Sequence, residues 1–319
     1  MARAADGRPA VALHLAFAGT PEFAATILRG LAGSDHNVKF VISQPDARRG
    51  RGRRLRPPPV ASLARELGLP LRQPERISEV RDEIAACDAL VVAAYGQILH
   101  PDTLYAARLG AWNVHASLLP RYRGAAPIER AIMAGERKSG VTIIRMDEGL
   151  DTGDVALRRE LEIPPDMTGG ELSERLARLG SEAIVEVLDL LQKGELQLTP
   201  QDHLQATYAA RLTPEDLAVD WRLPATRVHD HIRALAPHIG ARAFHPRYRG
   251  PVKLYRSRLP DDPPRLSTGE IQTRNGRIFV GCGRGAVELL KLQLPGKRPL
   301  PAADLLRGNP LEGAFQVHA

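Results

Sequence analysis

Apolar positions in the first two hundred residues follow two alternating patterns. Short apolar runs typical of buried strands occur at residues 11–18, 38–43, 89–95 and 140–146, with an alternating run at 154–163. Apolar side chains at helical spacing predict helices after Pro21 and at 60–67, 127–134 and 170–193. We expect Thr20 to cap the first helix, with Pro21 in its first turn. Strands that alternate with helices predict βαβ units and an α/β domain.

The second half of the chain has a different pattern. Residues 199–208 are mostly polar and lack periodicity, so we interpret them as a linker. A helix is predicted at 225–236, and short β-like runs follow at 252–256, 269–273, 277–282 and 287–292. This spacing indicates a small antiparallel barrel. A chain of 319 residues also exceeds the roughly 250–300 at which single cores divide, so we predict separate domains at 10–198 and 209–315.

The net charge of +7 is distributed unevenly. Residues 209–319 hold 18 Lys and Arg against 10 Asp and Glu, so the rest of the chain is almost neutral. That first part nevertheless contains a dense basic loop with Arg48, Arg49, Arg51, Arg53, Arg54 and Arg56. A basic domain and a basic loop together favour a polyanionic partner such as nucleic acid. Solubility, or the base composition of the genome, is the simpler alternative.

Signals for targeting and for redox chemistry are weak. No apolar run reaches the roughly 18–20 residues of a membrane helix, and the run at 11–18 is too short for a signal peptide. Cys87 and Cys282 lie far apart and lack the spacing of metal ligands, so we expect two free thiols. We therefore expect a cytoplasmic protein without a membrane segment or a bound metal.

The strongest chemical signal comes from one stretch and a later loop. Asn113 and His115 are two residues apart at an apparent strand end, so both side chains should leave the same face of the sheet. Asp151 follows in the acidic loop Gly149–Asp154, between two predicted strands. An amide donor for an oxyanion, an imidazole and a carboxylate are together what acyl transfer to an amine requires. Taken singly, a histidine at a strand end and an aspartate in a turn are usually structural.

Other candidate groups indicate a site that works without a covalent intermediate. Ser117 has no Gly-x-Ser-x-Gly context, and neither cysteine has the surroundings of a nucleophile. Ligands of open α/β sheets bind at the carboxyl ends of the strands. Gly96, Gln97, Ile98 and Leu99 follow the most apolar strand and are therefore a candidate ligand wall, with an ordinary turn as the alternative.

Three motifs combine these residues into a known pattern. They are the opening run Phe17–Ala24, the central stretch Asn113–Ile128 and the acidic loop Gly149–Asp154. In these motifs the chain resembles the methionyl-tRNA formyltransferases, a family among the formyltransferases that use 10-formyltetrahydrofolate. The Asn-x-His pair with a later Asp is common to that whole superfamily. The arginine loop, the segment Arg123–Ile128 and the basic second half are similar to the tRNA enzymes in particular.

The resemblance implies a fold, a reaction and a set of site residues. The fold would be a doubly wound, Rossmann-like α/β domain followed by a small OB-like β-barrel. The enzyme, a monomer without a metal, would transfer formyl from 10-formyltetrahydrofolate to methionine on initiator tRNA, for translation initiation. Catalytic roles would fall to Asn113, His115 and Asp151, folate would contact Ser117, Leu118, Leu119 and Pro120, and Gly96 to Leu99 would line the pteridine pocket. The arginine loop would enter the acceptor stem, and the barrel would hold the tRNA backbone.

The sequence departs from the usual family pattern in places. The basic loop carries Arg where relatives more often carry Lys, which keeps the charge but changes the contacts. Leu217-Ala218 and His238-Ile239 also differ from the residues expected there. Three other functions fit part of the pattern: formylation of a sugar nucleotide or small amine, hydrolysis that releases formate, and RNA binding with a degenerate site. The first would not need the arginine loop, and the intact Asn113, His115 and Asp151 argue against the last.

Overall fold

The computed structural model describes residues 12–49 and 54–317. The chain divides into two compact units. The first consists of Met1–Gly124, Ser139–Leu161 and Ser173–Tyr208, and the second of Ala125–Lys138, Glu162–Leu172 and Ala209–Ala319. The domain boundaries expected near residues 198 and 209 stay a prediction, because compactness alone does not define a functional domain.

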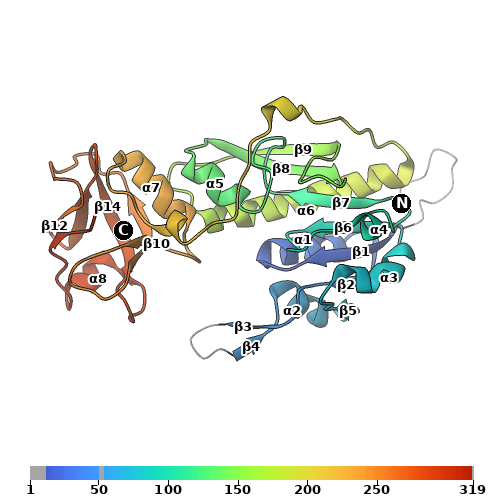
Figure 1. Ribbon diagram of the computed structural model, residues 1–319, viewed down its shortest axis with the longest axis horizontal. Coiled ribbons are helices and arrows are strands. Elements are labelled where there is room, and N and C mark those ends of the chain that lie inside the picture. Colours follow the sequence, from blue (N-terminus) through green and yellow to red (C-terminus); the bar gives the residue numbers. More distant parts are fainter. Residues whose placement is uncertain (1–11, 50–53, 318–319) are drawn as a thin grey trace. The chain divides into compact units, whose positions relative to one another are not determined.

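The first unit is built on a seven-stranded sheet (Figure 1). In spatial order the strands are β5 (Leu71–Arg72), β2 (Asn37–Ile42), β1 (His14–Gly19), β6 (Ala89–Ala93), β7 (Ala111–His115), β8 (Lys138–Arg145) and β9 (Val155–Glu162). The five strands from β5 to β7 are parallel to their neighbours, and β8 runs antiparallel to β7. The predicted Rossmann-like α/β fold is confirmed, and β7 lies where the parallel part of the sheet ends.

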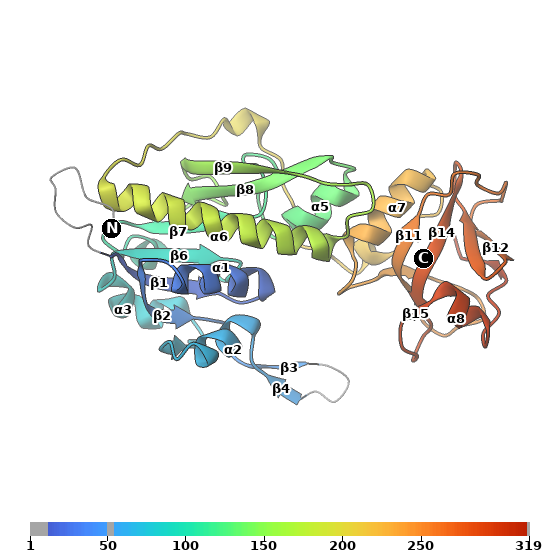
Figure 2. The ribbon, with the colours of Figure 1, turned by 180° about the vertical axis from the view of Figure 1, so that it is seen from behind.

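Helices cover both faces of this sheet (Figures 1 and 2). One face carries α1 (Glu22–Ala32) and α6 (Gly169–Lys193), and the other carries α3 (Arg81–Ala85) and α4 (Pro101–Leu104). The helix α2 (Pro59–Glu66) starts with proline at its first position and packs against α1. The core on the α3 side is formed by β1, β2 and β6 with Ile77, Ile84 and Leu104.

The start of α1 differs from the prediction. Pro21, rather than Thr20, is the N-cap residue, and no side chain caps this helix end. The hydroxyl of Thr20 donates instead to the backbone carbonyl of Tyr95, at 2.8 Å. Thr20 therefore joins the loop after β1 to the loop after β6, at the end of the sheet where ligands of such folds bind.

The second unit contains an antiparallel sheet. Its strands, in spatial order, are β10 (Ala241–Ala243), β11 (Val252–Arg258), β14 (Ala286–Gln293), β13 (Arg277–Gly281), β12 (Glu270–Arg274) and β16 (Gly313–Ala314), and β15 (Leu300–Pro301) pairs with β14. This curled sheet confirms the predicted small β-domain of OB-like class. Its core contains Trp221 and Phe315, whose rings stack with centroids 5.3 Å apart.

Helices α5 (Pro127–Met133), α7 (Ala225–Ala234) and α8 (Ala302–Leu306) belong to the same unit. Arg130 of α5 holds the carboxylate of Asp216 with two hydrogen bonds, of 2.8 and 2.6 Å. This guanidinium, with a backbone bond from Thr213, lowers the pKa of Asp216 to about 2. The pair fixes the short 3₁₀ turn Glu215–Leu217 to α5.

Within residues 12–49 and 54–317, no helix combines the length and the apolar character needed to cross a membrane.

Candidate active site

The structure brings together the three residues that carry the predicted chemistry. Asn113 and His115 lie on β7, and Asp151 lies in the loop between β8 and β9. Asn113 Nδ2 donates to Asp151 Oδ1 at 3.3 Å, and His115 Nδ1 lies 3.6 Å from Asp151 Oδ2. Only 6% of the His115 side chain and 13% of the Asp151 side chain are exposed. Their interaction is therefore only weakly screened by solvent.

The alternation of β7 explains why both side chains share one face. Val114 points toward α6, where a Cβ placed on Gly180 would lie only 2.7 Å from Val114 Cγ1. The glycine lets α6 lie close against β7, and it fixes which face of the strand is buried beneath that helix. Asn113 and His115, on either side of Val114 in the strand, must then leave the opposite face.

The acidic loop has its own internal supports. The carboxylate of Asp147 accepts from Thr152 Oγ1 at 2.6 Å and from the backbone of Gly149 at 3.1 Å. Gly153 approaches β8 so closely that a Cβ there would lie 1.9 Å from the carbonyl oxygen of Arg145. Asp151 itself has a left-handed backbone, with φ of 53°. The loop thus presents one carboxylate toward β7 from a conformation that side-chain-bearing residues seldom adopt.

Backbone groups after β7 complete the surroundings of the pair. The amide of Gly124 donates to Asp151 Oδ2 at 2.8 Å, and His115 Nε2 lies 3.0 Å from the carbonyl oxygen of Tyr122. Because a carbonyl can only accept, this bond assigns a hydrogen to His115 Nε2. A second proton on Nδ1 would then make the imidazole a cation that faces the Asp151 carboxylate. The arrangement is suited to holding a proton transiently.

The predicted folate segment, Ser117, Leu118, Leu119 and Pro120, follows β7 directly and is tied to β8. Thr142 Oγ1 donates to the carbonyl of Ser117 at 2.7 Å and accepts from the backbone of Leu119 at 3.1 Å. Ser117 Oγ donates to the carbonyl of Arg121 at 2.7 Å. The serine hydroxyl is thereby engaged in shaping the turn and has no base beside it in these contacts.

The predicted ligand wall, Gly96 to Leu99, follows β6, the strand beside β7. Two backbone groups hold the side-chain amide of Gln97. Its Oε1 accepts from the backbone amide of Ile77, and its Nε2 donates to the backbone carbonyl of Glu75, each at 3.0 Å. Ile98 is 84% exposed, whereas Leu99 is buried. A Cβ on Gly96 would meet no atom within 4 Å, so space is open beside this segment.

The described ends of the arginine loop form two short strands. Strand β3 (Ala47–Arg49) pairs antiparallel with β4 (Arg54–Arg56), in the register Arg48↔Leu55. Arg51 and Arg53 lie outside the described residues. Arg54, Leu55 and Arg56 are exposed, and the large apolar side chain of Leu55 is 66% exposed. The sequence predicts no strands here, because a strand of three residues is too short to show an alternation of apolar and polar positions.

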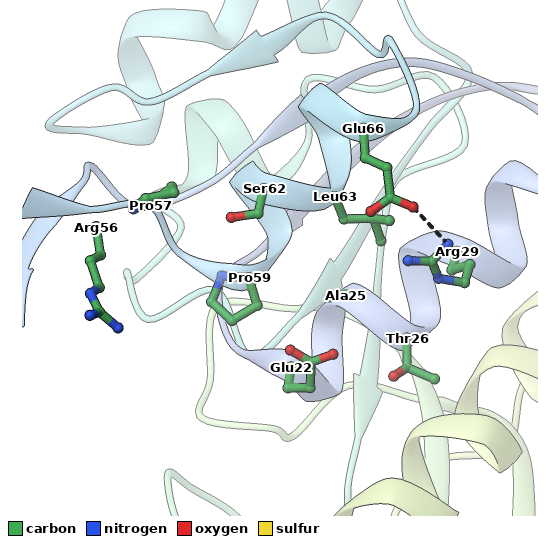
Figure 3. Close-up of a pocket in the computed structure, with 10 residues that line it drawn as sticks. All are labelled: Glu22, Ala25, Thr26, Arg29, Arg56, Pro57, Pro59, Ser62, Leu63 and Glu66. Atoms are coloured by element: carbon green, nitrogen blue, oxygen red, sulfur yellow. Dashed lines mark hydrogen bonds and ion pairs between the residues drawn. The ribbon is translucent and has the colours of Figure 1, made fainter.

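A hollow of about 500 Å³ lies at the base of this hairpin, between α1 and α2 (Figure 3). It is lined by Arg56 and Pro57 and by residues of the two helices, and the Arg29–Glu66 ion pair of 3.3 Å crosses from one helix to the other. None of the three residues of the proposed chemistry lines it. With Glu22 and Glu66 on its wall, the hollow presents both signs of charge.

Sequence reasoning missed several groups that shape the site. They are the carbonyl of Tyr122, the amide of Gly124, and Gln201 and Thr207 of the expected linker.

The two thiols are free, as expected, and both are buried. Burial raises the pKa of Cys87, and it raises the pKa of Cys282 to about 12, so neither is a thiolate at neutral pH. Within the described ranges, no group of three or more His, Cys, Asp and Glu residues could hold a metal ion.

Comparison with known proteins defines the class first. The sequence profile described as formyl transferase matches residues 13–188, and the one described as formyl transferase, C-terminal domain, matches residues 211–310. A solved sugar 3N-formyl transferase shares the fold, with a TM-score of 0.63 and 17% identity, over 90% of this chain and 99% of the other. The fold and both sequence profiles place the chain in the formyl transferase class.

Two relatives identify the family within this class. The methionyl-tRNA formyltransferase of Rubrobacter xylanophilus is 65% identical over 95% of this chain and 100% of its own length. That of Methylobacterium nodulans is 46% identical over 94% of this chain and 97% of its own. The chain belongs to the methionyl-tRNA formyltransferase family.

Proposed function

We propose that this protein transfers the formyl group of 10-formyltetrahydrofolate to the free amino group of methionine carried by initiator tRNA, for translation initiation. One observation carries the proposal: Asn113 and His115 both lie against the carboxylate of Asp151, in a chain that is 65% identical, over almost all its length, to a methionyl-tRNA formyltransferase. The reaction needs no nucleophile from the protein, which agrees with the buried thiols and the engaged hydroxyl of Ser117.

In this proposal, Asn113 stabilises the charge that develops on the formyl oxygen. The neutral methionine amine attacks the formyl carbon, a C–N bond forms, and the carbonyl oxygen becomes an oxyanion. The Nδ2 group of Asn113 carries two hydrogens, and donation of one to Asp151 fixes the plane of the amide. The second hydrogen is then oriented for the oxyanion. One such donor is typically worth about 10²–10³ in rate.

His115 and Asp151 handle the proton in this mechanism. The attacking amine loses a proton to the pair, and the folate nitrogen gains one as its bond to the formyl carbon breaks. The products are formylmethionyl-tRNA and tetrahydrofolate, and no proton is gained or lost overall. With Nε2 held by the Tyr122 carbonyl, the nitrogen that would take the proton is Nδ1, which lies 3.6 Å from Asp151 Oδ2. Either residue of the pair can be the first acceptor of the amine's proton.

The residues at the ends of β6 and β7 fit a bound folate. Ile98 is an exposed apolar side chain at a strand end, and a flat pteridine ring over it would remove apolar surface from water. The neighbouring space beside Gly96 is open. Ser117 to Pro120 offer a backbone that Thr142 holds in place. We assign Gly96 to Leu99 and Ser117 to Pro120 to the folate. The solved sugar 3N-formyl transferase was determined in the presence of dTDP and 5-N-formyl-THF.

The tRNA would meet two basic regions. The first is the arginine loop, with Arg48, Arg49, Arg51, Arg53, Arg54 and Arg56, which we assign to the acceptor stem. The second is the OB-like domain at 209–315, whose excess of Lys and Arg suits the phosphate backbone. Residues 10–198 would form the catalytic domain. One chain supplies all three proposed catalytic residues, so a monomer suffices for the proposed reaction, which would take place in the cytoplasm, where charged tRNA is used.

A mass balance tests this function against its rivals. The purified protein is mixed with 10-formyltetrahydrofolate and methionine-charged initiator tRNA, and tetrahydrofolate and formylmethionyl-tRNA are both quantified. The proposal predicts one formylmethionyl-tRNA for each tetrahydrofolate formed. Tetrahydrofolate with free formate would move the function to hydrolysis. If only an amino sugar or other small amine is formylated, the assignment to tRNA fails while the site residues keep their roles.

A further inference from the structure

The segment 199–208, expected to be a linker, contacts the acidic loop that carries Asp151 and the turn after β7 that supports His115. Thr207 Oγ1 accepts from the backbone amide of Tyr122 at 2.8 Å, and the carbonyl of Thr207 accepts from the amide of Arg123 at 2.8 Å. The carbonyl of the same Tyr122 is the partner of His115 Nε2, at 3.0 Å. Thr207 therefore fixes the backbone from which the imidazole takes its orientation.

Gln201 fixes the backbone of the acidic loop in a similar way. Only 5% of this residue is exposed, and its Nε2 donates to the carbonyl of Asp151 at 2.9 Å and to that of Gly153 at 2.7 Å. Its Oε1 accepts from Arg123 Nη2 at 2.7 Å. One amide thus joins the loop of the catalytic carboxylate to the turn after β7. The amide of Gly124, next along that turn, donates to Asp151 Oδ2.

Arg123 lies buried at the centre of these hydrogen bonds. Only 2% of it is exposed, and Nη2 also donates to His203 Nδ1 at 3.0 Å. A guanidinium carries no acceptor, so His203 must present a bare Nδ1 and hold its hydrogen on Nε2. Gln201 and His203, which both accept from Nη2, come from the same short segment. Removing that segment would leave a buried cation without these acceptors, which is costly.

Both turns need to be held because each contains a strained residue. Tyr122 has φ of 60° and Asp151 has φ of 53°, the left-handed region in which residues with a Cβ are disfavoured. Such conformations persist only where surrounding contacts determine them. Here the contacts are hydrogen bonds that join Thr207 to the first turn and Gln201 to the second.

We propose that Gln201 and Thr207 are positioning residues: they set the geometry of the His115–Asp151 pair through the turns at 120–124 and 147–153. The inference rests on the proposed function for its kinetic consequence, while its structural content concerns only the free protein. The segment 199–208, which the sequence predicts to be a linker, then helps to shape the active site.

Matched variants test the proposal. Thr207→Val keeps the shape of the side chain and removes the acceptor for Tyr122, whereas Thr207→Ser keeps the hydroxyl. Gln201→Met keeps the volume and removes all three hydrogen bonds. Leu204→Ala is the control, since Leu204 is 97% exposed in the same segment. We expect kcat to fall about 10–100-fold in Thr207→Val and Gln201→Met, the size typical of a small misplacement of reacting groups. KM for both substrates, and the activities of Thr207→Ser and Leu204→Ala, should stay as in the wild type.

Two further readouts separate positioning from general stability. If Thr207 acts through His115, adding Thr207→Val to a His115→Ala variant should cost no further kcat, and the same holds for Gln201→Met added to Asp151→Ala. Hydrogen exchange of the free protein should be faster at the Gly124 amide in Gln201→Met and Thr207→Val than in Leu204→Ala. Additive losses of kcat, or unchanged kcat in both single variants, would overturn the proposal, as would unchanged Gly124 exchange. A wild-type protein that formylates no methionyl-tRNA would overturn the proposed function and leave the exchange result to decide this inference.

Discussion

Replacing Asp151 with asparagine tests the electrostatic core of the mechanism. The change keeps the size of the side chain, and Asn tolerates the left-handed backbone found here, with φ of 53°. The new amide oxygen can still accept from Gly124, but the amide nitrogen can no longer accept from Asn113 or attract a charged imidazole. Asp151→Asn therefore removes the charge with little change in the fold.

The size of the effect follows from the distance between the two groups. His115 Nδ1 and Asp151 Oδ2 are 3.6 Å apart. At an effective dielectric constant of about 20, opposite unit charges at that separation attract by about 4–5 kcal/mol. If His115 carries the proton in the transition state, losing that attraction slows the chemical step by about 10³-fold, because each 1.36 kcal/mol is about a factor of ten.

Single-turnover formylation at saturating enzyme measures this step without product release. We expect Asp151→Asn to lose about 10³ in rate while its tRNA affinity and melting temperature stay as in the wild type. Asp154→Asn, the same chemical change at an exposed carboxylate three residues further on, is the control and should be fully active. Normal single-turnover rates in Asp151→Asn would refute the reasoning that a charged imidazole faces this carboxylate during the reaction.

Three further predictions concern other parts of the molecule. Asn113→Ala should lower kcat by about 10²–10³ with little change in tRNA binding, and normal turnover would exclude the oxyanion role. Replacing Arg48, Arg54 and Arg56 with Ser should weaken tRNA binding and flatten its dependence on salt by about one unit of slope for each phosphate that is no longer neutralised, measured by filter binding across salt concentrations. Asp216 has a folded pKa of about 2 against an ordinary 3.8, so its contribution to stability is present above pH 4 and is lost as pH falls toward 2. Asp216→Asn should therefore cost about 1 kcal/mol at neutral pH, and melting curves should converge with the wild type in acid; a difference that persists at low pH would exclude this cause.

The sequence predicts correctly that Asn113 and His115 leave the same face of one strand, because this geometry is local. Two residues of one strand, separated by one position, must share a face, whatever the rest of the fold does. The acidic loop is also recognisable from its own residues. The same reasoning predicts the strands from β1 to β9 that have five or more residues, since these are long enough to carry a hydrophobic pattern.

The supporting groups could not be predicted in this way. The roles of Gln201 and Thr207 depend on where the chain passes after α6, and a polar stretch without periodicity gives no sign of that path. Thr20 is a plausible helix cap by sequence, yet the carbonyl of Tyr95, 75 positions away, takes its hydroxyl. The hairpin β3–β4 and the two-residue strands β15 and β16 are too short for any period to show.

The most direct test of the account is formylation of charged initiator tRNA in competition with charged elongator tRNA, with 10-formyltetrahydrofolate as the donor. Both tRNAs carry methionine, so the amine and the chemistry at Asn113, His115 and Asp151 are the same. The account predicts fast formylation of the initiator and little of the elongator, with an affinity for the initiator that falls as salt rises. Equal rates on both tRNAs, or consumption of the donor without formylated tRNA, would contradict it.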